Sequence, residues 1–342
     1  MGQRQAGRRG RGGAWRTTLA ATAVACGTVF GGSASGWAQP SAFPPPDTYP
    51  VVVPTEWGPP QPEHLSASRY LKAHPEATPW GTNNFGCRPT ARHPRPVILA
   101  HGTDATAYTD WAGIGPPLAA AGFCVFAPDY GGTPNATSFG TEDLRASSRQ
   151  FGDFVDRVLG ATGARKVDLV GFSQGATITR YYINKLGGAP KVDQWIGLAS
   201  PSYGGVMYGL VPLADAIPGL WDAYERVTSP AAIQQAQDSP FMRELNAGGD
   251  TVAGVRYTTL GSRVDEMIQP SGNIALTGPG ARNIVLQDLC PIDLTGHFHM
   301  VYDPFVQQVL LTLLDPDTAR LPRCAYVPLG TEIGEVILGA HS

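Results

Sequence analysis

The fold is decided by one stretch, Lys166-Val-Asp-Leu-Val-Gly-Phe-Ser-Gln-Gly-Ala176. Its first half is an apolar run typical of a buried strand, and helical spacing follows over residues 176–186. Between them, Gly171-Phe-Ser173-Gln-Gly175 matches Gly-x-Ser-x-Gly, the sharp strand-to-helix turn that lifts a serine hydroxyl into a cleft. Neighbouring backbone crowds such a turn, so small residues are needed on both sides of the serine. Ser173 is therefore the predicted nucleophile, the alternative being a serine that only caps the helix.

Short apolar runs alternate with helical patterns on both sides of this turn. The runs expected to be buried strands are residues 96–100, 122–127, 166–170, 195–199, 255–260 and 283–287. Helical spacing covers residues 141–159, which Thr141-Glu-Asp143 can cap, and residues 176–186, which end at Gly187-Gly188. This alternation implies right-handed crossovers, and it predicts an α/β fold with a mostly parallel central sheet flanked by helices.

The overall composition excludes several classes of protein. The chain has 342 residues, of which 42% are hydrophobic and 15% are charged. That charged fraction is well below the usual quarter, so a solvated coil or a charged coiled coil is excluded. The formal net charge of −3 lacks the basic excess that phosphate-backbone binding requires, so nucleic acid is not an expected partner.

The amino terminus reads as a secretion signal. Residues 1–38 carry five arginines and no acidic residue, and an apolar stretch and then small residues follow the arginines. Cleavage is expected after Ala38, which leaves 20 basic and 28 acidic side chains, a net charge of −8. Two alternatives stay open: a twin-arginine signal at Arg8-Arg9, whose following residues fit poorly, and a lipoprotein anchored through Cys26. Either way, the mature chain is expected outside the cytoplasm.

The mature chain divides into two expected parts. Residues 39–80 are crowded with proline and are expected to form an extended arm, because proline fixes φ and removes backbone donors. Residues 81–342 are the expected catalytic domain. Within it, residues 203–250 interrupt the alternation and are expected to form a cap or lid between two strands, either a mobile cover or a static pocket wall.

The mature chain holds four cysteines, Cys87, Cys124, Cys290 and Cys324. An even count in an exported protein indicates disulfides, and four cysteines allow three pairings. Cys87–Cys124 and Cys290–Cys324 are favoured, because each closes a loop of about 35 residues around neighbouring core elements and each stabilises the fold by about 3–4 kcal/mol. Free buried thiols are the alternative. No cysteine or histidine spacing suggests zinc.

A serine nucleophile needs a base that takes its proton and an acid that orients the base. In the α/β-hydrolase fold, which this turn indicates, the acid follows the serine in the chain and the histidine follows the acid. His297 lies a short loop after the last expected strand and just before a helix expected from about residue 300, so it is the predicted base. His341 is one residue from the C-terminus, and His299 is expected to be a supporting or surface group. A metal site at these two neighbouring histidines lacks an evident third ligand.

The predicted acid is Asp265, in the loop after the penultimate strand. Glu266 and Asp293 are its rivals, and any single aspartate can instead only cap a loop. The transition state also needs donors for its oxyanion. Thr103 follows the strand at residues 96–100, so its backbone N–H is one expected donor, and its hydroxyl could add a further one. The backbone N–H of Gln174 is the other expected donor. His101 is expected to pack this loop and not to act as a base.

Four motifs together resemble a known family. They are Ile98-Leu-Ala-His-Gly-Thr103, Gly122-Phe-Cys-Val-Phe-Ala-Pro-Asp-Tyr-Gly131, Gly171-Phe-Ser-Gln-Gly175 and His297-Phe-His-Met-Val-Tyr-Asp-Pro304. In combination they are similar to the secreted class 2 lipases of high-GC Gram-positive bacteria and, more distantly, to the fungal lipase B type. The resemblance covers roughly residues 80–325.

The resemblance implies an α/β-hydrolase acting on carboxylic esters, often triacylglycerols. Carried over to this chain, it implies Ser173, Asp265 and His297 as the triad and Thr103 and Gln174 as oxyanion donors, and it supports both disulfides. One position departs from the pattern: many relatives carry Asp just before the histidine, where this chain has Gly296. The departure leaves the triad intact but puts a supporting contact in doubt.

The sequence therefore predicts a secreted serine ester hydrolase, foremost a triacylglycerol lipase. It is expected to act on lipid or other carboxylic esters, with a lipid–water interface as a further partner and no cofactor or metal. A monomer is favoured, but the sequence leaves the oligomeric state open. A cutinase-like polyester hydrolase is an alternative, although the 48 residues of the insertion weigh against it. An acyltransferase is another. A catalytically inactive binding protein is the alternative from a different class, and the complete Ser, Asp, His order argues against it.

Overall fold

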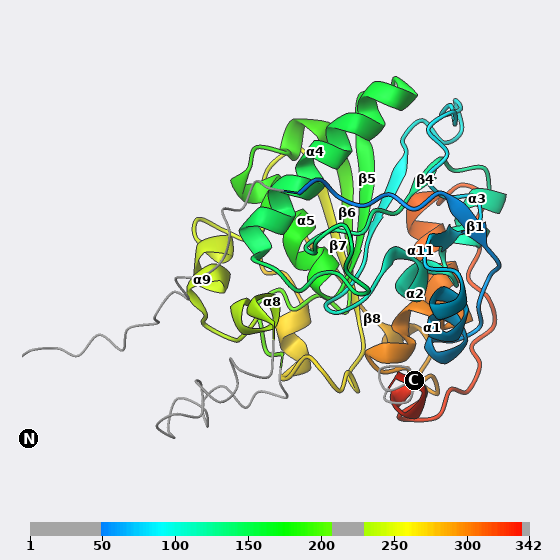
Figure 1. Ribbon diagram of the computed structural model, residues 1–342. Helices are drawn as coiled ribbons and strands as arrows, with labels where there is room; N and C mark the ends of the chain where they lie inside the picture. The colour runs from blue at the N-terminus through cyan, green and yellow to red at the C-terminus, as the bar shows by residue number, and fades with distance from the viewer. Residues whose placement is uncertain (1–48, 207–228, 337–342) are drawn as a thin grey trace, which may run out of the picture. The chain divides into compact units, whose positions relative to one another are not determined.

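The computed structural model describes residues 49–206 and 229–336 (Figure 1). Its centre is a six-stranded parallel sheet with the order β4-β3-β5-β6-β7-β8. The strands are β3 (Val97–Ala100), β4 (Val125–Phe126), β5 (Val167–Phe172), β6 (Val192–Leu198), β7 (Arg256–Gly261) and β8 (Arg282–Val285). The sheet is parallel and flanked by helices, as the alternation of strand and helix patterns predicts.

Side chains of successive strand residues point into two separate cores. Ile98 and Ala100 pack on one face with α4 (Leu144–Thr162) and α5 (Gln174–Lys185). Val97 and Leu99 pack on the other face with α2 (Ala107–Trp111), α3 (Gly115–Ala120) and α11 (Pro304–Leu314). Alternate residues of a strand face opposite sides of its sheet, so a strand buried on both faces must be apolar throughout. Figure 1 shows these helices on the two sides of the sheet.

Residues 39–80 were expected to form an extended arm, but residues 49–80, the part that the structure describes, contain regular secondary structure. Residues 49–80 contain β1 (Glu56–Gly58), α1 (His64–Ala73) and β2 (Ala77–Pro79), and β1 pairs with β2 in a small parallel sheet. Buried Asn83 donates to the carbonyls of Pro54 and Ala127 and so ties this segment to the end of β4. The prolines of this segment lie mostly between short helices and strands, and these elements pack on the rest of the domain. Residues 1–48, with the expected signal and Cys26, lie outside the described residues.

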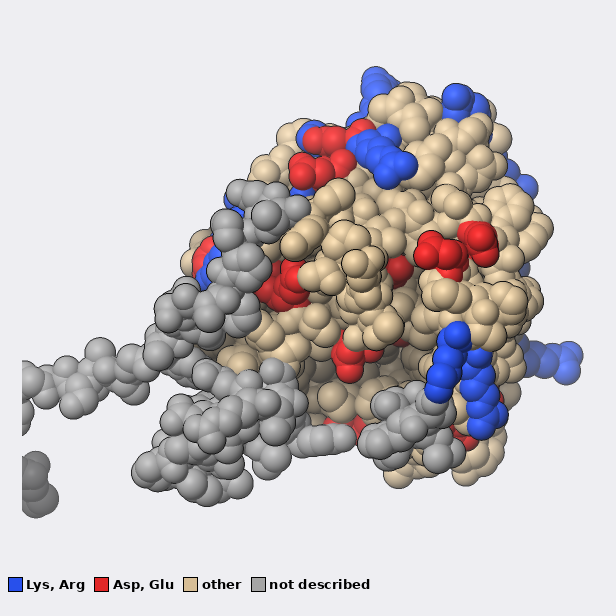
Figure 2. Space-filling view, viewed as in Figure 1, with Lys and Arg blue, Asp and Glu red and all other residues tan. Residues whose placement is uncertain are grey.

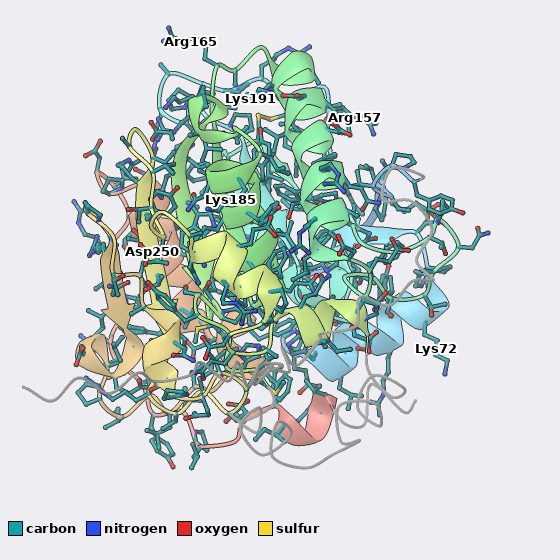
Figure 3. All side chains as sticks on the ribbon, turned by 90° about the vertical axis from the view of Figure 1, so that its left-hand side faces the viewer. Lys72, Arg157, Arg165, Lys185, Lys191 and Asp250 are labelled. Atoms are coloured by element: carbon teal, nitrogen blue, oxygen red, sulfur yellow. A yellow bond between two sulfur atoms is a disulfide. The ribbon has the colours of Figure 1, made fainter. Side chains whose placement is uncertain are left out.

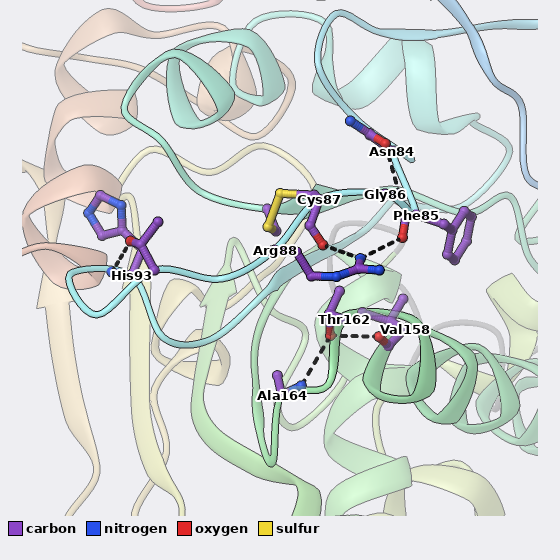
Figure 4. Close-up of a disulfide and its surroundings, with 11 residues drawn as sticks. Asn84, Phe85, Gly86, Cys87, Arg88, His93, Val158, Thr162 and Ala164 are labelled. Atoms are coloured by element: carbon purple, nitrogen blue, oxygen red, sulfur yellow. Dashed lines mark hydrogen bonds between the residues drawn. A yellow bond between two sulfur atoms is a disulfide. The ribbon is translucent and has the colours of Figure 1, made fainter.

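Both favoured disulfides are present. Cys87–Cys124 joins the segment before β3 to β4, and Cys290–Cys324 joins the loop after β8 to the chain after α11. Figure 4 shows the first of them, where the Arg88 guanidinium donates to the carbonyls of Cys87 and Phe85. Each disulfide therefore links a peripheral segment to the core, as the spacing of the cysteines suggests.

Some expected boundaries differ from those observed. The strand expected over residues 122–127 is reduced to β4, and the chain after β8 turns into α10 (Leu286–Leu289) where a strand was expected to continue to residue 287. Asp143 caps α4 by accepting from two backbone N–H groups. After His297 a short 3₁₀ turn, η3 (Phe298–Val301), precedes α11. Among the described helices, none combines the length and the apolar character needed to cross a bilayer.

The described part of the expected cap contacts the helices α4 and α5. It includes α8 (Pro230–Gln234) and α9 (Pro240–Asn246), and residues 207–228 lie outside the described residues. Fully buried Arg180 of α5 donates to Asn246 and to the carbonyl of Ser202. Asp250, labelled in Figure 3, accepts from the backbone N–H groups of Thr277 and Gly278. Both ends of the insertion are thus held by hydrogen bonds to the domain.

Two glycines in helices predict opposite effects of the same substitution. A Cβ at Gly175, at the start of α5, would lie 1.9 Å from the carbonyl oxygen of Ala100, whereas a Cβ at Gly160 in α4 meets nothing within 4 Å. Gly175→Ala should therefore lower the free energy of unfolding by about 1–3 kcal/mol or more, because backbone must move. Gly160→Ala should raise it by about 0.5–1 kcal/mol through helix propensity. Urea unfolding of the purified chains measures both, and equal effects would contradict the close packing at Gly175.

Candidate functional site

The turn between β5 and α5 holds Ser173 in a strained conformation. Its φ is +50° and its ψ is −118°, in a region that residues with a Cβ rarely adopt. The strain is held by flanking structure: the Ser173 N–H donates to the Leu198 carbonyl at 2.9 Å, and a Cβ at Gly171 would lie 2.3 Å from the Ala176 nitrogen. This is the expected elbow. It places Ser173, 8% exposed, at the amino end of α5, where developing negative charge is favoured.

The predicted base and acid are brought together from two separate loops. Nδ1 of His297 lies 3.0 Å from Oδ2 of Asp265. The other carboxylate oxygen of Asp265 accepts from the N–H groups of Met267 at 2.9 Å and Ile268 at 2.7 Å. Asp265 is fully buried, so these donors are what stabilise its charge. The acid is fixed by backbone and in turn fixes the tautomer and the orientation of the imidazole.

The two rival acids have different partners. Glu266 accepts from the backbone N–H of His297 at 2.7 Å and from that of Phe298 at 3.2 Å, so it holds the loop and not the ring. Asp293 accepts from the N–H of Thr295 at 3.0 Å. Among these three carboxylates in the described chain, Asp265 is the one with a hydrogen bond to the imidazole.

The departure at Gly296 has a physical explanation. A Cβ at this position would lie 1.9 Å from Oε2 of Glu266. A larger side chain at residue 296 and the observed position of Glu266 therefore exclude each other. In this chain residue 296 has no side-chain carboxylate, and the carboxylate next to the His297 backbone is that of Glu266. The sequence does not reveal this pairing, because the two residues are 30 positions apart.

Charges around His297 set its proton affinity. Burial lowers the pKa of His297, but the charge and the hydrogen bond of Asp265, with the charges of Glu266 and Asp110, raise it further than burial lowers it. The net pKa lies above the ordinary value of 6.5. A base with such a pKa is well suited to take a proton near neutral pH and to return it.

Two buried aspartates that the sequence analysis did not single out hold the loop after β3. Asp110 accepts from the Gly102 N–H at 2.7 Å, and Asp129 accepts from the Ala107 N–H at 2.6 Å. Burial raises the pKa of each to about 7, although these hydrogen bonds oppose the shift. No local motif marks either residue, and their role comes from tertiary contacts alone.

The predicted oxyanion residues are in contact. Nε2 of Gln174 donates to Oγ1 of Thr103 at 2.8 Å, so the loop after β3 and the start of α5 meet beside Ser173. His101 is fully buried and stacks on Tyr130 with ring centroids 4.3 Å apart. Burial lowers the pKa of His101 to about 4, against the opposing hydrogen bond with Gly102. His101 therefore packs inside the loop after β3, as the sequence analysis predicts.

His299 has carboxylate partners of its own. Its Nδ1 lies 2.9 Å from Oε1 of Glu332, and its Nε2 lies 3.8 Å from Oδ2 of Asp303. His341 lies outside the described residues. Among the described residues, no group of three or more His, Cys, Asp and Glu side chains is arranged to hold a metal ion.

A cavity of about 1240 Å³ opens onto the site. Ser173, His297 and Thr103 line it, together with apolar side chains that include Phe139, Phe172, Val206, Met267, Ile268 and Phe298. On the face seen in Figure 2, lysines and arginines are spread out and do not gather into one basic field. The site is thus a roomy chamber in which the serine and the imidazole lie among apolar side chains and further polar ones, including Lys72, Glu76 and Asp104.

Comparison with known proteins identifies the fold and the family of the chain. The fold is shared with lipase B of Aspergillus fumigatus, at 22% identity and a TM-score of 0.58 over 77% of this chain and 64% of that one. The chain thus spans less than two thirds of the length of that enzyme. A lipase of Bacillus licheniformis in its mature form aligns at 18% identity over 67% of this chain and 94% of that one, with a TM-score of 0.48. The family model of class 2 lipases matches residues 94–309, more than half of the sequence, and with that match the chain belongs to the class 2 lipase family.

Proposed function

We propose that this protein is a secreted serine ester hydrolase, foremost a triacylglycerol lipase or carboxylesterase. The observation that carries the proposal is the hydrogen bond from His297 to buried Asp265 beside a strained Ser173 that lines the same cavity. Membership of the lipase family suggests ester hydrolysis, and these residues supply the parts that the reaction needs.

The mechanism follows from the roles of these groups. His297 takes the proton of the Ser173 hydroxyl as Oγ attacks the ester carbonyl, and Asp265 stabilises the resulting imidazolium. The oxyanion is stabilised by the N–H groups of Thr103 and Gln174 and by the amino end of α5. His297 then protonates the departing alcohol, and an acyl-enzyme remains. In the second half, His297 takes a proton from water as the water oxygen attacks the acyl carbonyl. It then returns this proton to Oγ of Ser173 as the carboxylic acid leaves.

The cavity favours esters with an apolar acyl part. Its volume and its phenylalanine, methionine and aliphatic lining residues suit a hydrocarbon chain. A cutinase-like polyester hydrolase and an acyltransferase use the same acyl-enzyme and are the alternatives. A hydrolysis panel from short-chain esters through long-chain triacylglycerols to a polyester film separates these substrates, and an added alcohol acceptor reveals acyl transfer.

Export is part of the proposal. The arginine-rich, then apolar, amino-terminal sequence supports it, and two disulfides are typical of proteins outside the reducing cytoplasm. Sequencing the amino terminus of protein recovered from the culture medium tests it: Gln39 supports cleavage after Ala38, and a lipidated Cys26 would favour an anchored form instead.

Replacing the nucleophile should abolish turnover without unfolding the chain. Ser173→Ala removes Oγ, so hydrolysis of p-nitrophenyl esters should fall to background while the thermal unfolding midpoint stays close to that of the parent. A fluorophosphonate probe should label the parent and not the variant. An unlabelled, inactive parent would favour the binding-protein alternative, and a variant that still turns over would exclude Ser173 as the nucleophile.

Asparagine replacements distinguish the acids. Asp265→Asn should lower kcat by a factor on the order of 10³–10⁴, because the amide neither fixes the tautomer nor stabilises the imidazolium. Asp293→Asn, a buried carboxylate without a contact to the ring, is the matched control and should keep kcat within about threefold. The acid would be wrongly assigned if the second change were the more damaging one.

The raised pKa of His297 predicts the acid limb of the pH profile. Protonated His297 cannot accept the Ser173 proton, so kcat/KM should fall as the pH drops, with a midpoint above 6.5. Asp110 also titrates near 7, with a pKa of about 7. Asp110→Asn is the control, because it retains an acceptor for the Gly102 N–H without a titrating group. Loss of the acid limb in that variant would assign the limb to Asp110.

A further inference from the structure

The hydroxyl of Thr103 receives hydrogen bonds from two amide side chains. Nε2 of Gln174 lies 2.8 Å from its Oγ1, and Nε2 of Gln235 lies 3.0 Å from it. Gln174 begins α5, whereas Gln235 immediately follows α8 in the insertion. Both glutamines are almost fully buried. The insertion therefore reaches the predicted oxyanion loop through one defined contact.

Backbone carbonyls fix which end of each amide faces Thr103. Nε2 of Gln174 also donates to the Gly140 carbonyl at 2.7 Å, and Nε2 of Gln235 also donates to the Ala231 carbonyl at 3.2 Å. Turning either amide over would place its oxygen against a carbonyl oxygen, so the nitrogen must lie on this side. In both residues Oε1 is buried without a partner in the described structure, a costly arrangement. The amides are thus held in an orientation that serves the threonine.

A hydroxyl group has two acceptor lone pairs and a single proton to donate. The two amides occupy the lone pairs of Oγ1, so its O–H must point elsewhere. Thr103 lines the cavity that Ser173 and His297 also line. We propose that Gln235 is a positioning residue which, together with Gln174, turns the Thr103 hydroxyl proton toward the developing oxyanion. The inference rests on the proposed ester hydrolysis and adds a catalytic duty for the insertion.

The neighbouring glutamine provides a matched control. Gln234 lies next to Gln235 but contacts the start of α4: its Oε1 accepts from the Leu144 N–H at 2.7 Å, and its Nε2 donates to Asp143 at 2.6 Å. Replacing Gln234 therefore loosens α8 without changing the donors to Thr103. An effect of Gln235 that came only from anchoring α8 should appear at Gln234 as well.

The experiment is a double-mutant cycle between Gln235 and Thr103 in the full-length mature protein. Gln235→Met removes the donor at nearly constant volume and without adding charge. It should lower kcat about tenfold on a p-nitrophenyl ester and leave KM nearly unchanged, because the lost interaction acts in the transition state. In a Thr103→Val background, Gln235→Met should lower kcat less than twofold further. Thr103→Ser, which keeps a hydroxyl, should retain most of the activity, and Gln234→Met should keep kcat within about twofold.

Three outcomes would overturn the inference. They are an equal loss from Gln235→Met in the parent and in the Thr103→Val background, a loss in Gln234→Met as large as that in Gln235→Met, or a rise in KM with kcat unchanged. If Gln235→Met does not fold, Gln235→Leu completes the same cycle. Failure of the proposed function looks different, because the parent would then neither hydrolyse esters nor react with a fluorophosphonate.

Discussion

The structure depends on the close approach of α5 to the end of β3. The start of that helix lies so near the Ala100 carbonyl that position 175 has no room for a side chain. This contact forces the chain to leave β5 and enter α5 in a single tight turn, and Ser173 at its apex accepts a positive φ. Strain of this kind persists only when the surrounding structure holds it, and here two core clusters on either side of the sheet do so.

Once the elbow is fixed, sheet order determines what can reach the serine. β5 lies between β3 and β6, and β7 and β8 follow beyond β6. Because all the strands are parallel, the loops after β3, β7 and β8 emerge at the same edge as Ser173. They carry Thr103, Asp265 and the approach to His297. The order of these residues along the chain therefore follows from the topology of the sheet. For this reason, the residues that follow each predicted strand already indicate much of the candidate site.

The sequence predicts those parts of the molecule that short stretches of residues determine, such as apolar strands and the turn at Ser173. Apolar runs mark β3, most of β5 and the second half of β6, so the sequence predicts these strands close to their observed positions. The expected strand at residues 195–199 misses the start of β6, because Asp193 and Gln194 interrupt the apolar run. The segment before residue 80 was mispredicted, because its proline content indicates where backbone bonds are missing but not that α1 and β2 find partners in the domain. The sequence also does not predict that Glu266 occupies the space of a side chain at residue 296, because this contact depends on two loops that are distant in the chain.

The electrostatics at the site require more than one carboxylate. Burial by itself makes the His297 imidazole resist protonation, and the proposed catalytic cycle requires it to carry a proton briefly. Asp265, Glu266 and Asp110 all raise its proton affinity, and each accepts a backbone N–H that limits the cost of burying its own charge. Those same hydrogen bonds hold the loops at residues 102 and 297. Charge stabilisation and loop positioning therefore depend on the same contacts. Replacing one of these carboxylates by the matching amide removes its charge from the surroundings of the imidazole, while the amide oxygen still accepts the backbone N–H.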